Sequence, residues 1–222
     1  MYVLNFSIWT DIHCGNYSTA TALVSEFNAL KNQTGSLFWA AWGTMQRGCL
    51  LALTGKASDA AQTITSGLTE MRQTGTTMWM PVWQSFLTKV KAEIGQFDAA
   101  SRCSDESMAA METTKEKWYE AEVNRIAGEV ALLSPQPDVV KAEAHFGRAL
   151  EIARRQQAKS WELRAAMSMA RLWRDQGKPH RGRDLLAPVH GWFTEGFNTH
   201  DLRQSKRLLD ELASRGRSSS QG

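Results

Sequence analysis

The side chains that could bind a metal ion or act as nucleophiles in this chain are mainly five histidines and three cysteines. Zinc motifs place their ligands a few residues apart along the chain. Here no histidine lies three or four residues from another histidine or from a cysteine. His180, His190 and His200 recur every ten residues, a spacing that matches no local metal motif. We therefore expect no metal and no cofactor, and the local sequence suggests no Ser/His/Asp or Cys/His catalytic arrangement.

The cysteines have the pattern of free thiols rather than of a disulfide framework. Cys14, Cys49 and Cys103 are odd in number, far apart, and include no CxxC pair. This usage is typical of a reducing compartment, so we expect a cytoplasmic protein with small, buried cysteine side chains. A reactive thiol beside His13 or Arg47 is the alternative. The chain also lacks a GxxxxGK(S/T) loop, so we expect no P-loop nucleotide site.

The formal net charge of +3 is small for 222 residues and implies neither a nucleic-acid nor a membrane partner. The charge is unevenly distributed, because residues 1–95 carry 6 basic and 5 acidic side chains and residues 96–222 carry 20 and 18. The stretch Ser36–Thr54 is apolar enough to consider as a membrane span. Arg47 lies near its centre, where a charge is costly in a bilayer. We therefore predict a helix buried between neighbouring helices.

The sequence that carries these residues repeats about every forty positions. Short segments that begin with glycine or proline start at residues 15, 55, 95, 137 and 177, with steps of 40, 40, 42 and 40. Alanines near the ends of these segments and a series of tryptophans keep the same period. The repeat positions are Gly15, Ala20, Trp39, Gly55, Ala60, Trp79, Gly95, Ala100, Trp118, Ala142, Trp161 and Gly177. A period of this length is typical of a helical solenoid, in which each unit packs on its neighbours.

Each repeat unit reads as two helices joined by a short turn. In the third unit, Thr77–Ile94 has apolar residues at helical spacing, Pro81 fits the first turn, and Gly95 can end the helix in the left-handed conformation. In the fourth unit two prolines replace the glycine turn, and Ala142–Ala153 carries an amphipathic stripe. We expect the tryptophans that open the first helices to be buried, so Trp118→Ala should cost a few kcal/mol.

The pattern predicts an all-α fold, a right-handed α-solenoid of about five helix-turn-helix units with a closing C-terminal helix. The units cover about 1–34, 35–75, 76–115, 116–158 and 159–195, and the closing helix covers 199–213, so one repeat domain spans 1–213. Residues 214–222 have no apolar side chain and are expected to be disordered. No polar capping helix precedes the first unit. We therefore expect a longer protein, in which the charge-poor N-terminal half packs on preceding domains or self-associates.

The glycine turn followed by a helix such as Ala142–Leu150 resembles the tetratricopeptide repeat (TPR). A narrower resemblance covers Trp161–Leu212, which is similar to the C-terminal end of large bacterial regulators. Those proteins join an adenylate or guanylate cyclase domain, or a winged-helix domain, to a signalling ATPase of the STAND type and a helical repeat region. The resemblance implies a sensor or interaction module with its catalytic sites in upstream domains. We therefore expect no enzyme activity in this chain itself.

In TPR arrays the first helix of each unit lines the concave face, which suggests where a partner would bind. The side chains expected on that face are Trp42, Met45, Glu122, Arg125, Glu129, Arg164, Met167 and Arg171. A groove that is apolar at one end and arginine-rich at the other suits a peptide with a hydrophobic stretch and an acidic end. The alternative is that these are ordinary solvated side chains.

The sequence is thus best interpreted as a non-catalytic module for protein–protein interaction or signal sensing. Its partner would be a protein, a peptide or upstream domains of the same polypeptide, with no nucleic acid and no membrane involved. A small-molecule effector held in the same groove is the alternative function. We expect Arg164→Glu combined with Arg171→Glu to abolish partner capture and to leave thermal melting unchanged.

Overall fold

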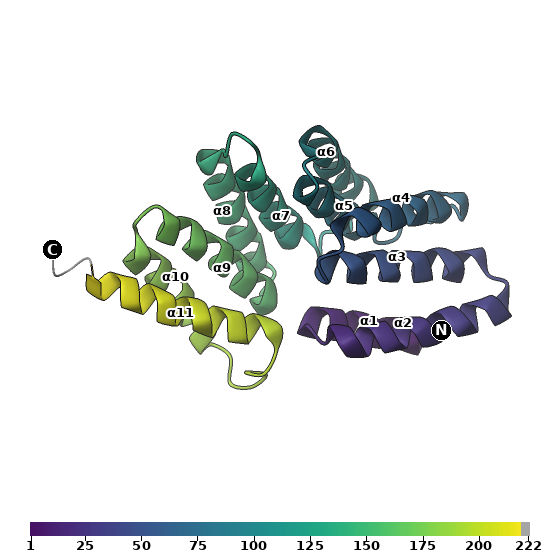
Figure 1. Cartoon of the computed structure of the whole chain (residues 1–222), viewed down its shortest axis with the longest axis horizontal. Helices are drawn as coiled ribbons and strands as arrows, with labels where there is room; N and C mark the ends of the chain where they lie inside the picture. The colour runs from purple at the N-terminus through teal and green to yellow at the C-terminus, as the bar shows by residue number, and fades with distance from the viewer. Residues whose placement is uncertain (219–222) are drawn as a thin grey trace. The chain divides into compact units, whose positions relative to one another are not determined.

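The computed structural model describes residues 1–218, without the side chains of Asn32 and of residues 216–218. This range contains eleven α-helices and no strand, which confirms the predicted all-α fold (Figure 1). The helices are α1 (Tyr2–Cys14), α2 (Tyr17–Thr34), α3 (Leu37–Leu53), α4 (Ala57–Gln73), α5 (Met80–Glu93), α6 (Phe97–Thr114), α7 (Glu120–Leu133), α8 (Val139–Arg155), α9 (Lys159–Asp175), α10 (Pro179–Gly191) and α11 (His200–Ser218).

Consecutive helices pack as pairs, α1 with α2 and so on to α9 with α10, and α11 packs on α10 and α9. This arrangement confirms five helix pairs and a closing helix. The chain divides into two compact units, Met1–Lys117 with helices α1 to α6 and a second unit that begins at Trp118.

Four of the five turns within pairs use the predicted glycine. Gly15, Gly55, Gly95 and Gly177 have φ between 76° and 79°, a left-handed conformation that glycine adopts without steric cost. The residue after each glycine donates its backbone N–H to the carbonyl five positions earlier, at 2.8–2.9 Å. This bond is the signature of a Schellman helix end. In the fourth pair, the side chain of Asp138 instead caps α8 by accepting from the N–H of Lys141 at 2.9 Å.

The two helices of a pair cross where small residues allow close approach. Ala20, Ala60, Ala100 and Ala142 are fully buried. The fourth pair shows such a close fit, because a Cβ added to Gly128 of α7 would lie 2.5 Å from Phe146 Cε1. Backbones that approach this closely leave no room for a larger side chain.

The repeat tryptophans do not fill the core as the sequence analysis expects. Trp118 is 39% exposed, whereas the next residue, Tyr119, is 2% exposed. The reason lies in where the helices begin: α5 starts at Met80 and α7 at Glu120, so Trp79 and Trp118 precede the first turn. Trp83, one turn into α5, is fully buried instead. We therefore expect Trp118→Ala to cost less than the few kcal/mol of a core truncation.

Two further predicted segments differ in outcome. Ser36–Thr54 forms α3, which packs against α4, α2 and α5, as expected for a buried helix. Within the described part of the chain, none of the helices is long and apolar enough to span a membrane. At the other end, α11 continues to Ser218, five residues beyond the predicted end of the closing helix at 213. The remaining residues of the predicted disordered tail, 219–222, lie outside the described range.

Candidate functional site

The groove residues predicted in the first unit lie in its core. Trp42 is 2% exposed and Met45 is fully buried, so neither offers a surface to a partner. Trp42 belongs to an aromatic cluster from α1, α3 and α5, in which its ring centroid lies 5.3 Å from Trp83 and 5.2 Å from Trp79. Trp9 completes the cluster at 5.2 Å from Trp83. These indoles hold three first helices of the unit together, a role that their helical spacing alone did not reveal.

In the second unit, the predicted residues of α7 form a continuous charged stripe. Glu122, Arg125 and Glu129 are spaced three and four residues apart, which places them on one face of the helix. The Arg125 guanidinium donates from Nε to Glu122 Oε2 and from Nη2 to Glu122 Oε1, both at 2.7 Å, and it also donates to Glu129. Such a two-point contact is the strongest geometry that an arginine and a carboxylate can form.

This stripe is linked to α9 and α11. Arg164 of α9 donates from Nε to Asp201 Oδ2 of α11 at 2.6 Å, and its Nη1 lies 3.4 Å from Glu122 Oε1. Ser168 of α9 donates its hydroxyl to Glu129 Oε1 at 3.2 Å. We call Glu122, Arg125, Glu129, Arg164, Ser168 and Asp201 the ionic layer. It joins three helices through paired charges.

Two members of the ionic layer were missed by the sequence analysis. Ser168 lies one turn after Arg164, so its place on the same helix face could have been found from the spacing. Asp201 lies 37 residues from Arg164 along the chain. No local pattern connects the two residues, because their contact depends on how α11 packs on α9.

Both arginines of the ionic layer are firmly charged. Burial by itself lowers the pKa of Arg125, but the carboxylates of Glu122 and Glu129 outweigh it and hold that pKa above the usual value. The same holds for Arg164, where burial is outweighed by Glu122 and Asp201 and the pKa is raised. Removing one charge of such a partly buried set leaves its partner unpaired, which is costly. The main role of these paired residues is therefore to fix the positions of α7, α9 and α11.

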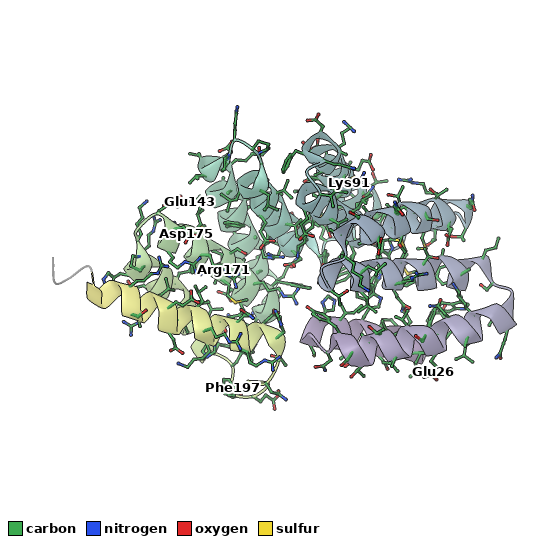
Figure 2. The ribbon with its side chains drawn as sticks, viewed as in Figure 1. Glu26, Lys91, Glu143, Arg171, Asp175 and Phe197 are labelled. Carbon is green, nitrogen blue, oxygen red and sulfur yellow. The ribbon has the colours of Figure 1, made fainter. Side chains whose placement is uncertain are left out.

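Arg171 is the exception on this face. It lies seven residues after Arg164 on α9, where Figure 2 labels it. It is partly exposed and makes no ion pair within the described residues. Burial lowers its pKa, and the nearby carboxylate of Glu129 offsets this only in part. An arginine stays protonated in proteins. Arg171 therefore presents a charged fork with unused donors. The remaining predicted residue, Met167, is 4% exposed and belongs to the core.

The described residues hold no group of three or more His, Cys, Asp or Glu side chains that could bind a metal ion. Cys49 and Cys103 are buried, and burial raises the pKa of both thiols. A raised pKa lowers the thiolate fraction, so these two cysteines are poor nucleophiles. Cys14 is partly exposed.

Comparison with solved structures places the chain in a fold class. It is similar to two crystal structures of nearly identical TPR-like repeats from a kinesin light chain-like protein of Podosopora anserina. One, a point variant, has a TM-score of 0.57 and 14% identity, with 86% of this chain and 92% of that chain covered. The other has a TM-score of 0.55 and 14% identity, with 86% and 93% covered.

At this identity the likeness establishes the fold, and the chain is built from TPR-like helical repeats. Comparisons of the sequence with protein-family models and with curated proteins found no match.

Proposed function

We propose that the chain is a non-catalytic protein-interaction module that binds an acidic peptide segment on the α7–α9–α11 face of its second unit. The proposal is supported by the TPR-like fold, which offers a long surface to other proteins. It depends on a single observation: of Arg125, Arg164 and Arg171, the three arginines predicted to line the groove, Arg171 alone makes no ion pair in the described chain.

The ionic layer would leave the Arg171 guanidinium available to a partner. Its carboxylates are already engaged by Arg125 and Arg164, so they would not compete strongly for Arg171. A carboxylate of the partner could accept two parallel hydrogen bonds from the Arg171 guanidinium, which is partly shielded from water. The rigid helices beneath would hold that guanidinium in place before binding and reduce the entropy lost on association.

The test compares Arg171→Glu with Arg183→Glu. Arg183 is an exposed arginine of α10 without a described ion pair, so its reversal changes the net charge equally. Each variant would be used as bait for partner capture, with captured proteins quantified by mass spectrometry. We expect Arg171→Glu to lose the partner and Arg183→Glu to retain it, with equal melting temperatures for both. A partner that binds Arg171→Glu as well as the wild type would rule out this site.

Arg164 must stay unchanged in this test. Because it bonds Asp201 and Glu122, reversing its charge would place three carboxylates together and destabilise the second unit. From these contacts we expect Arg164→Glu with Arg171→Glu to lower the melting temperature, whereas the sequence analysis expects no change.

A small-molecule sensor is the second candidate, and one feature of the first unit favours it. A hollow of about 380 Å³ is lined by Asn28, Lys31, Gly43, Thr44, Arg47 and Thr63. Lys31 and Arg47 make no ion pair in the described chain, so the hollow suits a small anion. Thermal-shift screening with inorganic phosphate and carboxylate metabolites would test it, because a ligand that binds only the folded state raises the melting temperature. Lys31→Gln should abolish any such shift.

The biological setting rests on resemblance. The likeness of Trp161–Leu212 to the ends of bacterial cyclase- and ATPase-linked regulators supports a role in a larger cytoplasmic signalling protein. The genomic reading frame upstream of the Met1 codon tests this. A cyclase or signalling ATPase encoded in the same frame would support it, and an in-frame stop directly upstream would remove it.

A further inference from the structure

A second surface of the second unit combines an apolar hollow with unpaired positive charge. A pocket of about 510 Å³ lies where the loop after α10 meets the first two turns of α11. It is lined by His190, Phe197, Leu202, Arg203, Lys206 and Arg207. Phe197 is 53% exposed, and Figure 2 shows it on this loop. An exposed aromatic ring beside a pocket is typical of a binding surface.

The acidic side chains of α11 that form ion pairs do so with residues other than Arg203 and Arg207. Asp201 bonds Arg164 at 2.6 Å, Glu211 accepts from Arg174 at 2.8 Å, and Asp210 pairs with Lys206. Arg203 and Arg207, one helical turn apart, are exposed and make no ion pair among the described residues. The rim of the pocket therefore carries two uncompensated guanidinium groups on the same helix face.

His190 is positioned as part of the pocket wall. The hydroxyl of Ser205 donates to the carbonyl of Leu202 at 3.0 Å, so its oxygen is left to accept from His190 Nδ1 at 2.8 Å. This bond fixes the ring and leaves only Nε2 for another contact. The ring centroid lies 6.3 Å from that of Phe197.

We propose that this pocket binds a peptide segment of a partner protein in which a large apolar side chain is followed by carboxylates. The apolar side chain would enter between Phe197 and Leu202, and the carboxylates would bind Arg203 and Arg207. The charge of the rim selects an acidic partner, and the volume accommodates one leucine or phenylalanine side chain. The site is distinct in its residues from the Arg171 face, so it goes beyond the proposed function.

The experiment uses the full chain and a defined probe, a Gly-Leu-Asp-Glu-Gly amide labelled with fluorescein at its N-terminus, with binding followed by fluorescence anisotropy at low salt. Two control peptides replace Leu by Ala, or Asp and Glu by Asn and Gln. We expect both controls to bind more weakly than the probe. Arg203→Gln with Arg207→Gln should weaken binding about five- to tenfold, the effect of losing two exposed ion pairs. Raising the salt concentration should narrow that difference.

Two matched variants separate this site from other surfaces. Arg183→Gln, which removes an exposed charge on α10, should bind the probe like the wild type, and so should Arg171→Gln. Failure of the Arg171 test above would therefore leave this proposal standing, and the reverse is also true. The proposal is overturned if no binding occurs at millimolar probe, or if either control peptide binds equally. It is also overturned if the double variant binds like the wild type, or if a thymidine oligonucleotide of equal charge competes as well as the unlabelled probe.

Discussion

The crossing of α7 and α8 makes a quantitative prediction, because the same substitution should have opposite effects at two glycines of this helix pair. Gly128 lies in α7, where an added Cβ would meet Phe146 Cδ1 at 2.7 Å and the backbone oxygen of Ala142 at 3.1 Å. Gly147 lies in α8, where an added Cβ would meet nothing within 4 Å. Both glycines are inside helices, so each carries the same conformational penalty.

The magnitudes follow from two opposing terms. Replacing a helical glycine by alanine stabilises the helix by about 0.5–1 kcal/mol. Overpacking a close contact costs about 1–3 kcal/mol. Gly147→Ala should gain the first term alone. Gly128→Ala should gain it and lose the second, because Phe146 is 1% exposed and the Ala142 oxygen belongs to the backbone, so neither can move aside easily.

Urea unfolding followed by circular dichroism would measure both variants against the wild type. We expect Gly128→Ala to be less stable than Gly147→Ala by about 1–3 kcal/mol, which corresponds to a gap of at least about 2 °C in melting temperature. The double variant Gly128→Ala with Phe146→Leu should lose less unfolding free energy than the two single variants lose together, since the smaller leucine side chain makes room for the added Cβ. Equal stabilisation by the two alanines would refute the close crossing.

Three further outcomes follow from the structure. Glu162 is 5% exposed, and although burial raises the pKa of its carboxyl group, hydrogen bonds from Lys159 and Arg154 hold that pKa below its usual value. The charged form therefore stabilises the fold above the unfolded-state pKa, so the stability advantage over Glu162→Gln, measured by urea unfolding, should shrink as the pH falls below about 4.5. In thiol titration with Ellman's reagent, Cys14 should react in the native protein, and Cys49 and Cys103 only after unfolding; three fast native equivalents would contradict the burial. Arg164→Ala should cost about 2 kcal/mol in urea unfolding through lost bonds to carboxylates, and an unchanged midpoint would show that its contacts contribute nothing.

The regular part of the fold was predictable from sequence because its causes are local. A glycine such as Gly15 or Gly95 permits the left-handed conformation that ends a helix, whatever its neighbours in the fold. The structure shows this left-handed conformation at every predicted glycine turn. The tryptophan series identified the period of the repeat correctly, but the prediction that these tryptophans are buried was wrong. Whether Trp118 or Tyr119 faces the core depends on where α7 begins, and a shift of one residue rotates a helix position by about 100°. Periodicity identifies the repeat more reliably than it identifies the buried residue.

The charged face shows the same limit at the level of function. Helical spacing correctly grouped Glu122, Arg125 and Glu129 on one face, but the spacing treated every charge on that face as available. Availability depends on partners far away in sequence, such as Asp201, which engages Arg164. Once those pairs are known, three arginines that look equivalent in sequence separate into two that fix helices and one, Arg171, that makes no ion pair in the described chain. A substitution that probes binding must therefore spare the paired charges, because any loss of capture at Arg164 would combine a lost contact with a displaced α11.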